Sequence, residues 1–322
     1  NNLDRPLFNR ALRGTYPPGS TIKPVLALAA LETGATNLTR KSVCIGYFQL
    51  EGNEHRYRDW RPEGHGPVDL HDAIAQSCDV YFYEMSGDLG INNMHDYLTR
   101  FGLGAETGVD LLGERPGLVP SRDWKRARYR QPWYPGETLI LGIGQGYMQT
   151  TPLQLAQAVT LMASRGKWIR PHLAKSIEGR PPVDEEPMPD IVLRDPKAWD
   201  HARFGMEQVM HGARGTARKV GDSAVYRVAG KSGTAQVVAI KQGEKYDRNK
   251  VAERHRDHAL FVAFAPAENP QIAVAVMVEN GESGSGVAAP VVKQVMDAWL
   301  LDEDGQLKAE YAPPLSAEAG QR

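Results

Sequence analysis

A serine and a lysine spaced as on one face of a helix give the clearest chemical signal in the chain. Ser20 and Lys23 follow a Tyr-Pro-Pro-Gly turn and precede a long apolar run. Residues three positions apart on a helix share a face, so the lysine amine would stand beside the serine hydroxyl. A serine becomes a strong nucleophile only when a base takes its proton, and a partly buried lysine can be that base. The pair therefore predicts nucleophilic catalysis at Ser20.

The segment that carries this pair is predicted to be a buried helix that begins at about Ser20. Pro24 is tolerated only in the first turn of a helix, and Gly34 is a good residue just beyond the last turn. A helix that begins there aims free backbone N–H groups at whatever the hydroxyl attacks. The same serine–lysine spacing recurs at Ser164, but Gly166 disfavours a helix there and no apolar run follows. We interpret that second pair as a loop after a helix.

Two further motifs contain groups that could complete a catalytic centre. The sequence Ser77-Cys78-Asp79 falls at a corner between two expected helices, residues 69–76 and 80–85. The sequence Lys231-Ser232-Gly233-Thr234 lies on an expected strand, where the glycine would let the backbone of a ligand approach closely. Taken singly, the serines could be helix caps and the lysine a solvent-facing strand residue. Three motifs in this order could hardly arise together by chance.

A set of soft and borderline metal ligands runs from the segment after the first motif into the second motif. Its members are Cys44, Asp59, His65 and Cys78. Two thiolates, one imidazole and one carboxylate would complete a tetrahedral zinc site, and the glycine-rich segment between them has little apolar content to hold it together. A Cys44–Cys78 disulfide or two buried free thiols are the alternatives. His55 and His71 are rival ligands.

The remaining pattern predicts an α+β fold with an antiparallel sheet. Apolar runs at 259–265 and 271–278 indicate a hairpin, residues 151–159 and 288–301 indicate helices, and residues 142–146 indicate a turn. We expect one domain over residues 1–302, with a mostly helical lobe roughly within 35–225 and a flexible tail over 303–322. The polar stretches 180–190 and 241–257 are predicted surface excursions.

Composition limits the function classes. The 322 residues include 38 Lys and Arg against 39 Asp and Glu, so the chain lacks the basic surplus of a nucleic-acid-binding protein. No apolar run reaches the roughly 20 residues of a membrane span, and the first residues show no signal-peptide pattern. Two cysteines do not determine the compartment.

The three motifs, with the run Gly-Gln-Gly-Tyr-Met-Gln-Thr-Thr-Pro at 144–152, resemble the transpeptidase domain of class B penicillin-binding proteins. The resemblance covers residues 4–302. The second motif has Asp79 where asparagine is commoner, and in this it resembles the elongation enzymes of the penicillin-binding protein 2 group. It implies the fold of penicillin-binding proteins and serine β-lactamases. That family places two core strands before the serine helix, so we expect these strands, the membrane anchor and the pedestal domain to lie outside this chain.

The resemblance also implies a role for each motif residue. Ser20 would attack the carbonyl of a D-Ala-D-Ala peptide, Lys23 would accept its proton, and Ser77 and Asp79 would relay protons and hold the substrate amide. Lys231 would supply positive potential. The substrate's terminal carboxylate would bind at Ser232, Gly233 and Thr234, and the backbone N–H groups of Ser20 and Thr234 would form the oxyanion hole. The penicillin-binding protein 2 group places ligand types at the spacing of Asp59, His65 and Cys78, and Cys44 fits the fourth position.

The expected function is a peptidoglycan D,D-transpeptidase in cell elongation and rod shape, inhibited by β-lactams, with a structural zinc ion and no organic cofactor. By resemblance, its partners are stem peptides, β-lactams, a membrane glycan polymerase and elongation scaffold proteins, with no nucleic acid, at the periplasmic face of the bacterial inner membrane. The alternatives are a D,D-carboxypeptidase or serine β-lactamase, and a non-enzymatic β-lactam sensor. A class A β-lactamase needs a glutamate-positioned water, and residues 139–151 contain no acidic residue.

Overall fold

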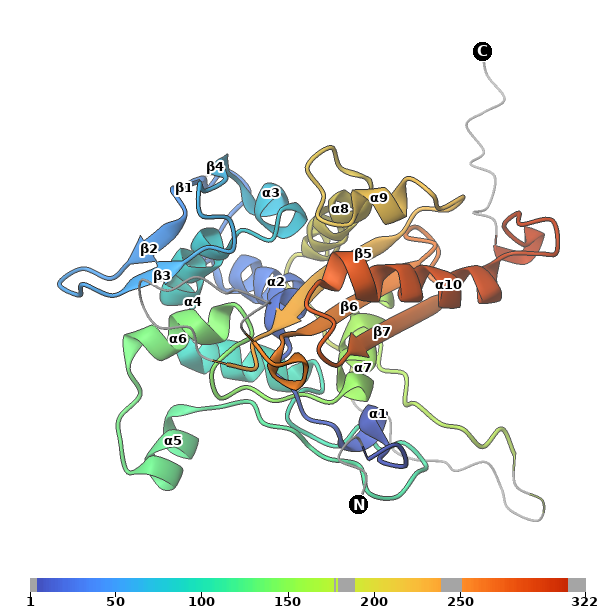
Figure 1. Ribbon diagram of the computed structural model, residues 1–322, viewed down its shortest axis with the longest axis horizontal. Helices are drawn as coiled ribbons and strands as arrows, with labels where there is room; N and C mark the ends of the chain where they lie inside the picture. The colour runs from blue at the N-terminus through green and yellow to red at the C-terminus, as the bar shows by residue number, and fades with distance from the viewer. Residues whose placement is uncertain (1–4, 177, 179–188, 239–250, 312–322) are drawn as a thin grey trace.

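A three-stranded antiparallel sheet forms one side of the molecule, and a mostly helical lobe forms the other (Figure 1). The computed structural model describes residues 5–176, 178, 189–238 and 251–311. The strands β5 (Ala229–Ala235), β6 (His258–Ala265) and β7 (Ile272–Val278) follow the order β5-β6-β7. The expected hairpin is confirmed to within one residue, because β6 and β7 are the two apolar runs joined by a short loop.

Helices cover both faces of this sheet. The helix α10 (Ala289–Leu300) crosses in front of the strands in Figure 1, and α7 (Pro152–Ala163) packs on β6 and β7. Residues 259–265 of β6 are therefore all buried, which explains why this strand is a continuous apolar run without alternation. The described chain contains these three strands of the main sheet, as expected from the sequence.

The central helix begins with a tight turn. The 3₁₀ turn η1 (Gly19–Ile22) leads directly into α2 (Lys23–Thr33), so the helical backbone starts beside Ser20 as predicted. Pro24 lies in the first α-helical turn, and Gly34 ends the helix with a φ of +78°. Every residue from Lys23 to Ala30 is buried, because α4 and α8 pack around this helix.

The helical lobe holds the second motif at the junction of two helices. Its helices are α3 (Leu70–Ala75), α4 (Asp79–Arg100), α5 (Arg122–Tyr129), α6 (Pro135–Gly142), α8 (Lys197–His211) and α9 (Arg218–Gly221). We predicted that the second helix of this junction ends near residue 85, but α4 runs to Arg100 through a kink at Gly90. The sequence after Met85 is polar and contains two glycines, so it does not show the apolar pattern of a helix.

Two short strand pairs lie beside these helices. β1 (Ser42–Cys44) pairs with β4 (Gly66–Val68), and β2 (Tyr47–Gln49) pairs with β3 (Arg56–Arg58) to form a protruding hairpin (Figure 1). The shorter elements are α1 (Arg10–Arg13), η2 (Glu253–His255), the π-helical turn η3 (Gly284–Ala288) and η4 (Ala309–Tyr311). Ser164 follows the last residue of α7, which confirms that the second serine–lysine pair lies in a loop.

The chain after α10 differs from the expected flexible tail. Leu301 and Leu307 form a β-bridge, the Lys308 N–H donates to the Leu300 carbonyl, and Tyr311 packs against the core. Apolar residues at 307 and 311 explain this return of the chain over 303–311. The rest of that segment, and most of the predicted excursions at 180–190 and 241–257, lie outside the described residues.

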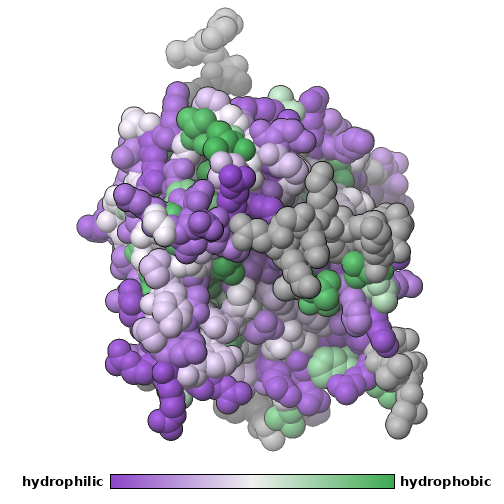
Figure 2. All heavy atoms as spheres, turned by 60° about the vertical axis from the view of Figure 1, so that its left-hand side comes forward, coloured by the Kyte–Doolittle hydropathy of each residue, from purple (hydrophilic) through white to green (hydrophobic). Residues whose placement is uncertain are grey.

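Figure 2 shows the face on which the β2–β3 hairpin, α5 and α6 come forward. On this face the hydrophobic residues form separate patches. Among the helices of the described residues, none is both long enough and apolar enough to cross a membrane.

Candidate active site

The three motifs meet at the hydroxyl of Ser77. Lys23 donates from Nζ to Asp79 Oδ1 at 2.6 Å and to the Ser77 carbonyl at 2.9 Å, and its Nζ lies 3.4 Å from Ser77 Oγ. Lys231 approaches from β5, and its Nζ donates to Ser77 Oγ at 2.9 Å. Both lysine side chains are fully buried. The start of α2, the α3–α4 corner and strand β5 thus bring two ammonium groups to one hydroxyl.

The corner that carries Ser77 has an unusual backbone conformation. Its φ is +58°, in the left-handed region that residues other than glycine rarely adopt, so the surrounding structure must hold it. Trp60 supplies two of these restraints, because its backbone N–H donates to Asp79 Oδ2 and its indole N–H donates to the Gln76 carbonyl. The strained corner aims the Ser77 hydroxyl between the two lysines.

Burial shapes the charge balance of this centre. Burial raises the pKa of the Asp79 carboxyl, and the ammonium of Lys23 opposes that rise. Burial also holds the pKa of Lys231 well below its ordinary value, and the charge of Lys23 adds to this effect. Two buried amines therefore face one carboxylate. With both amines protonated, the centre has a positive surplus that suits an anionic ligand group.

Ser20 is half-buried on a turn that is held from two sides. Gly19, just before it, has a φ of +55° and donates its N–H to the Gly144 carbonyl at 2.9 Å. A Cβ on Gly19 would lie 2.5 Å from the Thr234 carbonyl oxygen, so only glycine lets the turn lie against β5 here. Ser20 and Thr234 are therefore brought close through their backbones.

Two residues of this centre were missed by sequence reasoning. Gln145 donates from Nε2 to the Thr234 carbonyl at 2.8 Å, and the Thr216 hydroxyl lies 3.0 Å from that of Ser232. Gln145 stands in the Gly-Gln-Gly turn that the sequence did single out, which was the available signal. Thr216 carried no signal, because it belongs to no motif and the fold holds it in place through the bond from its N–H to the Ala75 carbonyl at the end of α3.

The glycine of the third motif has a different use from the one predicted. Ser232 and Thr234 are partly exposed on one face of β5, as alternation along a strand requires. A Cβ on Gly233, however, would lie 2.7 Å from Thr21 Cγ2 and 3.0 Å from the Pro18 carbonyl oxygen. The missing side chain therefore lets the serine turn pack on the strand.

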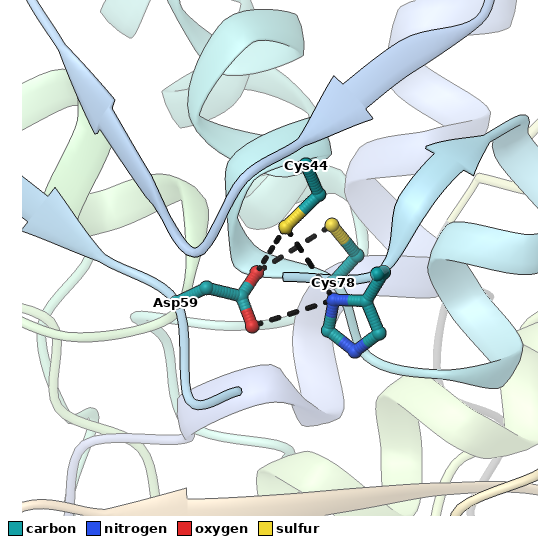
Figure 3. Close-up of side chains that lie close together, drawn as sticks. Cys44, Asp59 and Cys78 are labelled. Carbon is teal, nitrogen blue, oxygen red and sulfur yellow. Dashed lines mark hydrogen bonds and ion pairs between the residues drawn. The ribbon is translucent and has the colours of Figure 1, made fainter. Parts of the chain in front are cut away.

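The four predicted metal ligands lie together. One ligand atom from each of Cys44, Asp59, His65 and Cys78 lies within 4.8 Å of the others. Figure 3 shows both thiols and the Asp59 carboxylate pointing toward one another. His65 Nδ1 lies 3.5 Å from both Cys44 Sγ and Asp59 Oδ1, and Cys78 Sγ lies 3.5 Å from Asp59 Oδ2.

This geometry fits a metal ion. Ligands at the usual zinc distances stand about 3.3–3.8 Å apart at the corners of a tetrahedron, close to the separations found here. Both cysteines are buried free thiols, and burial raises the pKa of each. The rival ligands are elsewhere, since His55 packs on Tyr57 and His71 stacks on His201. The cluster could therefore bind a metal.

Asp59 connects this cluster to the catalytic corner. Its Oδ2 accepts the backbone N–H groups of Asp79 and Val80, at 2.8 and 3.2 Å, and so caps the start of α4. Burial works to raise the pKa of Asp59, but hydrogen bonds from His65 and the Arg61 N–H bring it below its ordinary value. An ionised carboxylate therefore serves the helix end and the candidate metal site together.

Comparisons with known proteins agree with this geometry. A sequence model described as the penicillin binding protein transpeptidase domain matches residues 1–297. The peptidoglycan D,D-transpeptidase MrdA of Haemophilus influenzae is 44% identical over 316 residues, 97% of this chain and 48% of that protein. The chain thus spans about half the length of this curated relative.

Solved structures share the fold. The crystal structure of Pseudomonas aeruginosa PBP2 in complex with WCK 5153 matches with a TM-score of 0.90 and 62% identity, covering 98% of this chain and 68% of that one. A complex of PBP2 and MreC from Helicobacter pylori matches with a TM-score of 0.79 and 34% identity, covering 93% and 52%. The expected α+β transpeptidase fold is confirmed.

The packing of Gly233 gives a stability prediction. Gly233→Ala should lower the free energy of unfolding by about 1–3 kcal/mol, because the new methyl group would press on Thr21 and Pro18. Urea unfolding would measure this change. Gly87→Ala is the matched control, since its Cβ would meet only Leu139 Cδ2 at 3.8 Å and alanine favours the helix. Equal loss of stability in both variants would contradict the close approach at Gly233.

Proposed function

The chain belongs to the penicillin-binding protein transpeptidase family, and on this basis we propose that it is a peptidoglycan D,D-transpeptidase of cell elongation. The observation that carries the proposal is the meeting of Lys23 and Lys231 at the Ser77 hydroxyl, with the half-buried Ser20 in the turn that leads directly into Lys23. A structural helix cap needs no buried amine nearby, whereas a nucleophilic serine needs a base, and a buried lysine amine can be that base.

In the proposed acylation step, Ser20 Oγ attacks the carbonyl between the two terminal D-Ala residues. The neutral amine of Lys23 accepts the hydroxyl proton, and the leaving D-Ala amine takes up a proton through the Ser77 hydroxyl. The close approach of Gly19 to Thr234 supports an oxyanion hole made by the backbone N–H groups of Ser20 and Thr234. An amine from a second stem peptide then attacks the acyl-enzyme and forms the cross-link.

Recognition of the substrate's terminal carboxylate is assigned to the third motif. The buried Lys231 supplies positive charge when protonated, and Ser232 and Thr234 are partly exposed on one face of β5. Thr216 orients the Ser232 hydroxyl, and Gln145 fixes the Thr234 backbone. Gly233 acts here only through the packing that its missing side chain permits.

Asp79 is assigned to holding Lys23 once it has taken up the Ser20 proton, because the two groups form a buried pair 2.6 Å apart. The Ser77 hydroxyl lies within reach of both lysines, which supports a proton path from one to the other. The lowered pKa of Lys231 makes that residue exchange protons more readily than an exposed lysine would.

The β-lactamase alternative is disfavoured by the groups near the site. The acidic residue nearest to the 139–151 segment is Glu137, and it is paired with the buried Lys125, accepts the Tyr134 N–H and is contacted by the Tyr147 hydroxyl. A carboxylate engaged in this way is not free to position a hydrolytic water.

A carboxypeptidase and a β-lactam sensor differ from a transpeptidase in the fate of the acyl-enzyme.

We assign the chain to the periplasmic face of the bacterial inner membrane. Its proposed partners are stem peptides, covalent β-lactams, a glycan polymerase in the membrane and scaffold proteins of the elongation complex. The complex of MreC with the related H. pylori protein supports the last of these.

The Cys44, Asp59, His65 and Cys78 cluster is proposed to hold a structural zinc ion. A bound zinc ion would supply positive charge that keeps both thiols ionised. Because Cys78 lies between Ser77 and Asp79, the ion would brace the catalytic corner from its middle residue.

Acylation by a penicillin tests the proposed function directly. Incubation should give a stable mass increase of one β-lactam per chain, abolished by Ser20→Ala and retained by Ser164→Ala. The two serines differ because Ser20 lies on the turn held against β5, whereas the Ser164 hydroxyl bonds to the Lys167 carbonyl in a surface loop. Intact-mass spectrometry over hours measures both the modification and its lifetime. Rapid recovery of the unmodified mass would instead indicate a β-lactamase.

The role of Lys23 is tested by a variant that keeps its charge. Lys23→Arg should slow acylation by about 10²–10⁴, because guanidinium does not release a proton in proteins. Stopped-flow kinetics with a chromogenic β-lactam measures the rate. Lys125→Arg is a matched control at another fully buried lysine with a carboxylate partner, and it should acylate at the wild-type rate. A wild-type rate in Lys23→Arg would reduce Lys23 to an electrostatic role.

Metal analysis tests the proposed zinc ion. The purified protein should contain about one zinc per chain and release two titratable thiols on denaturation with a chelator. Removal of the metal should lower Tm and slow acylation, because binding energy at a structural site contributes to folding. His65→Ala should reproduce the loss of zinc, whereas His55→Ala and His71→Ala should not. A metal-free protein without free thiols would show a disulfide, and one with two free thiols would show simple packing.

A further inference from the structure

A cavity of about 910 Å³ lies between the β2–β3 hairpin and the start of α6. Its volume is in the range of sites that hold small organic ligands, about 300–1,000 Å³. The rings of Tyr57, Trp133, Tyr134 and Tyr147 lie in its walls beside aliphatic side chains, and its polar side chains are on the hairpin and at Glu137 and Gln145. Of the motif residues described above, those that line this cavity are Gln145, Gly146 and Tyr147 of the 144–152 run.

The α6 wall of the cavity is rigidly held. Glu137 forms an ion pair with Lys125 and accepts the Tyr134 N–H at 2.8 Å, which fixes the first turn of α6. The ammonium of Lys125 lies 4.2 Å from the centre of the Tyr134 ring, on which it packs. Tyr147 packs on Trp133, with ring centres 6.4 Å apart, and donates to Glu137. An aromatic surface fixed in this way loses little entropy when a ligand binds.

The hairpin wall is held against the same helix. A Cβ on Gly136 would lie 2.2 Å from the Tyr57 hydroxyl, so the hairpin packs on α6 through this glycine. The exposed His55 ring packs on Tyr57, with ring centres 4.6 Å apart. Glu51 and Asn53 at the exposed end of the hairpin add hydrogen-bonding groups to the rim.

The cavity is continuous with the catalytic centre through one residue. Gln145 lines the cavity and also donates to the Thr234 carbonyl of β5. Its neighbour Gly144 accepts the N–H of Gly19, next to the nucleophile. A polymeric substrate bound at Ser20 could therefore extend over this turn into the cavity.

The side chains that line the cavity favour the sugar part of such a substrate over its peptide part. Its carboxylates are Glu51 and Glu137, and because Glu137 is already paired with Lys125, Glu51 is the group that would repel an acidic peptide. A neutral ligand with apolar faces and many hydroxyl and amide groups suits flat aromatic rings beside carboxylate and amide acceptors. We propose that this cavity is a saccharide subsite that binds N-acetylated amino sugars of the glycan strand to which the stem peptide is attached. The inference rests on the proposed peptidoglycan substrate and adds the recognition of its sugar.

Binding of a peptide-free sugar tests this subsite without requiring catalysis. The probe is a tetramer of β-1,4-linked N-acetylglucosamine, titrated into the full 322-residue chain by calorimetry. We expect binding both before and after acylation of Ser20 by benzylpenicillin, since the cavity is separate from the nucleophile. Failure of acylation would overturn the proposed function and leave sugar binding as an independent result.

Two tyrosines of equal exposure supply the matched variants. Tyr134 lines the cavity and is 49% exposed, whereas Tyr129 packs on Tyr147, is 48% exposed and lies outside the cavity. Tyr134→Ala should raise the Kd for the tetramer by about tenfold, the worth of one good aromatic contact. Tyr134→Phe and Tyr129→Ala should leave the Kd unchanged, and all three should acylate normally, which shows that they are folded.

A second variant tests the opposite wall. His55→Ala should also weaken binding of the tetramer, because its ring packs on Tyr57 at the hairpin. The proposal is overturned if the tetramer fails to bind at millimolar concentration or if acylation of Ser20 abolishes binding. It is equally overturned if Tyr129→Ala and Tyr134→Ala weaken binding alike, or if a sugar-free D-Ala-D-Ala peptide displaces the tetramer.

Discussion

The buried ammonium of Lys23 is the group around which the catalytic half of the molecule is organised. A fully buried charge is tolerated only with close partners, and removal of one partner of a buried pair costs about 3–5 kcal/mol. Asp79 and Ser77 supply those partners, so the α3–α4 corner must hold both of them toward α2. The left-handed backbone at Ser77 is the conformational cost of that requirement. Trp60 offsets this cost with two hydrogen bonds to the corner.

Two further arrangements hold the catalytic corner and the serine turn in the positions that the buried Lys23 requires. The first is the Asp59 carboxylate, which caps α4 and belongs to the thiol and imidazole cluster, so the catalytic corner and the candidate metal site share one anion. The second is the absence of side chains where backbones meet. Gly19 allows contact with Thr234, and Gly233 allows contact with Thr21. Larger residues at either glycine would separate the nucleophile from the strand that faces it.

Local features of the sequence predicted local structure well. Pro24 and Gly34 marked the two ends of the α2 region, and uninterrupted apolar runs marked β6 and β7. The motifs also predicted which residues meet, because each carries a chemical type that needs the others. The missed features depend on tertiary contacts. Thr216 and Gln145 act only through neighbours far along the chain, and α4 continues past Gly90 because packing supports a helix that its own sequence disfavours.

The order of the motifs along the chain has a consequence for synthesis of the protein. The hydrogen bonds that join the centre span 54 residues between Lys23 and Ser77 and 154 residues between Ser77 and Lys231. Contacts of such separation form late, after the entropy of closing long loops has been lost. Lys231 also lies on a strand that is held by β6, which is made later still. A partly synthesised or partly folded chain therefore carries Ser20 without its activating groups, and its nucleophile stays inert until the domain is complete.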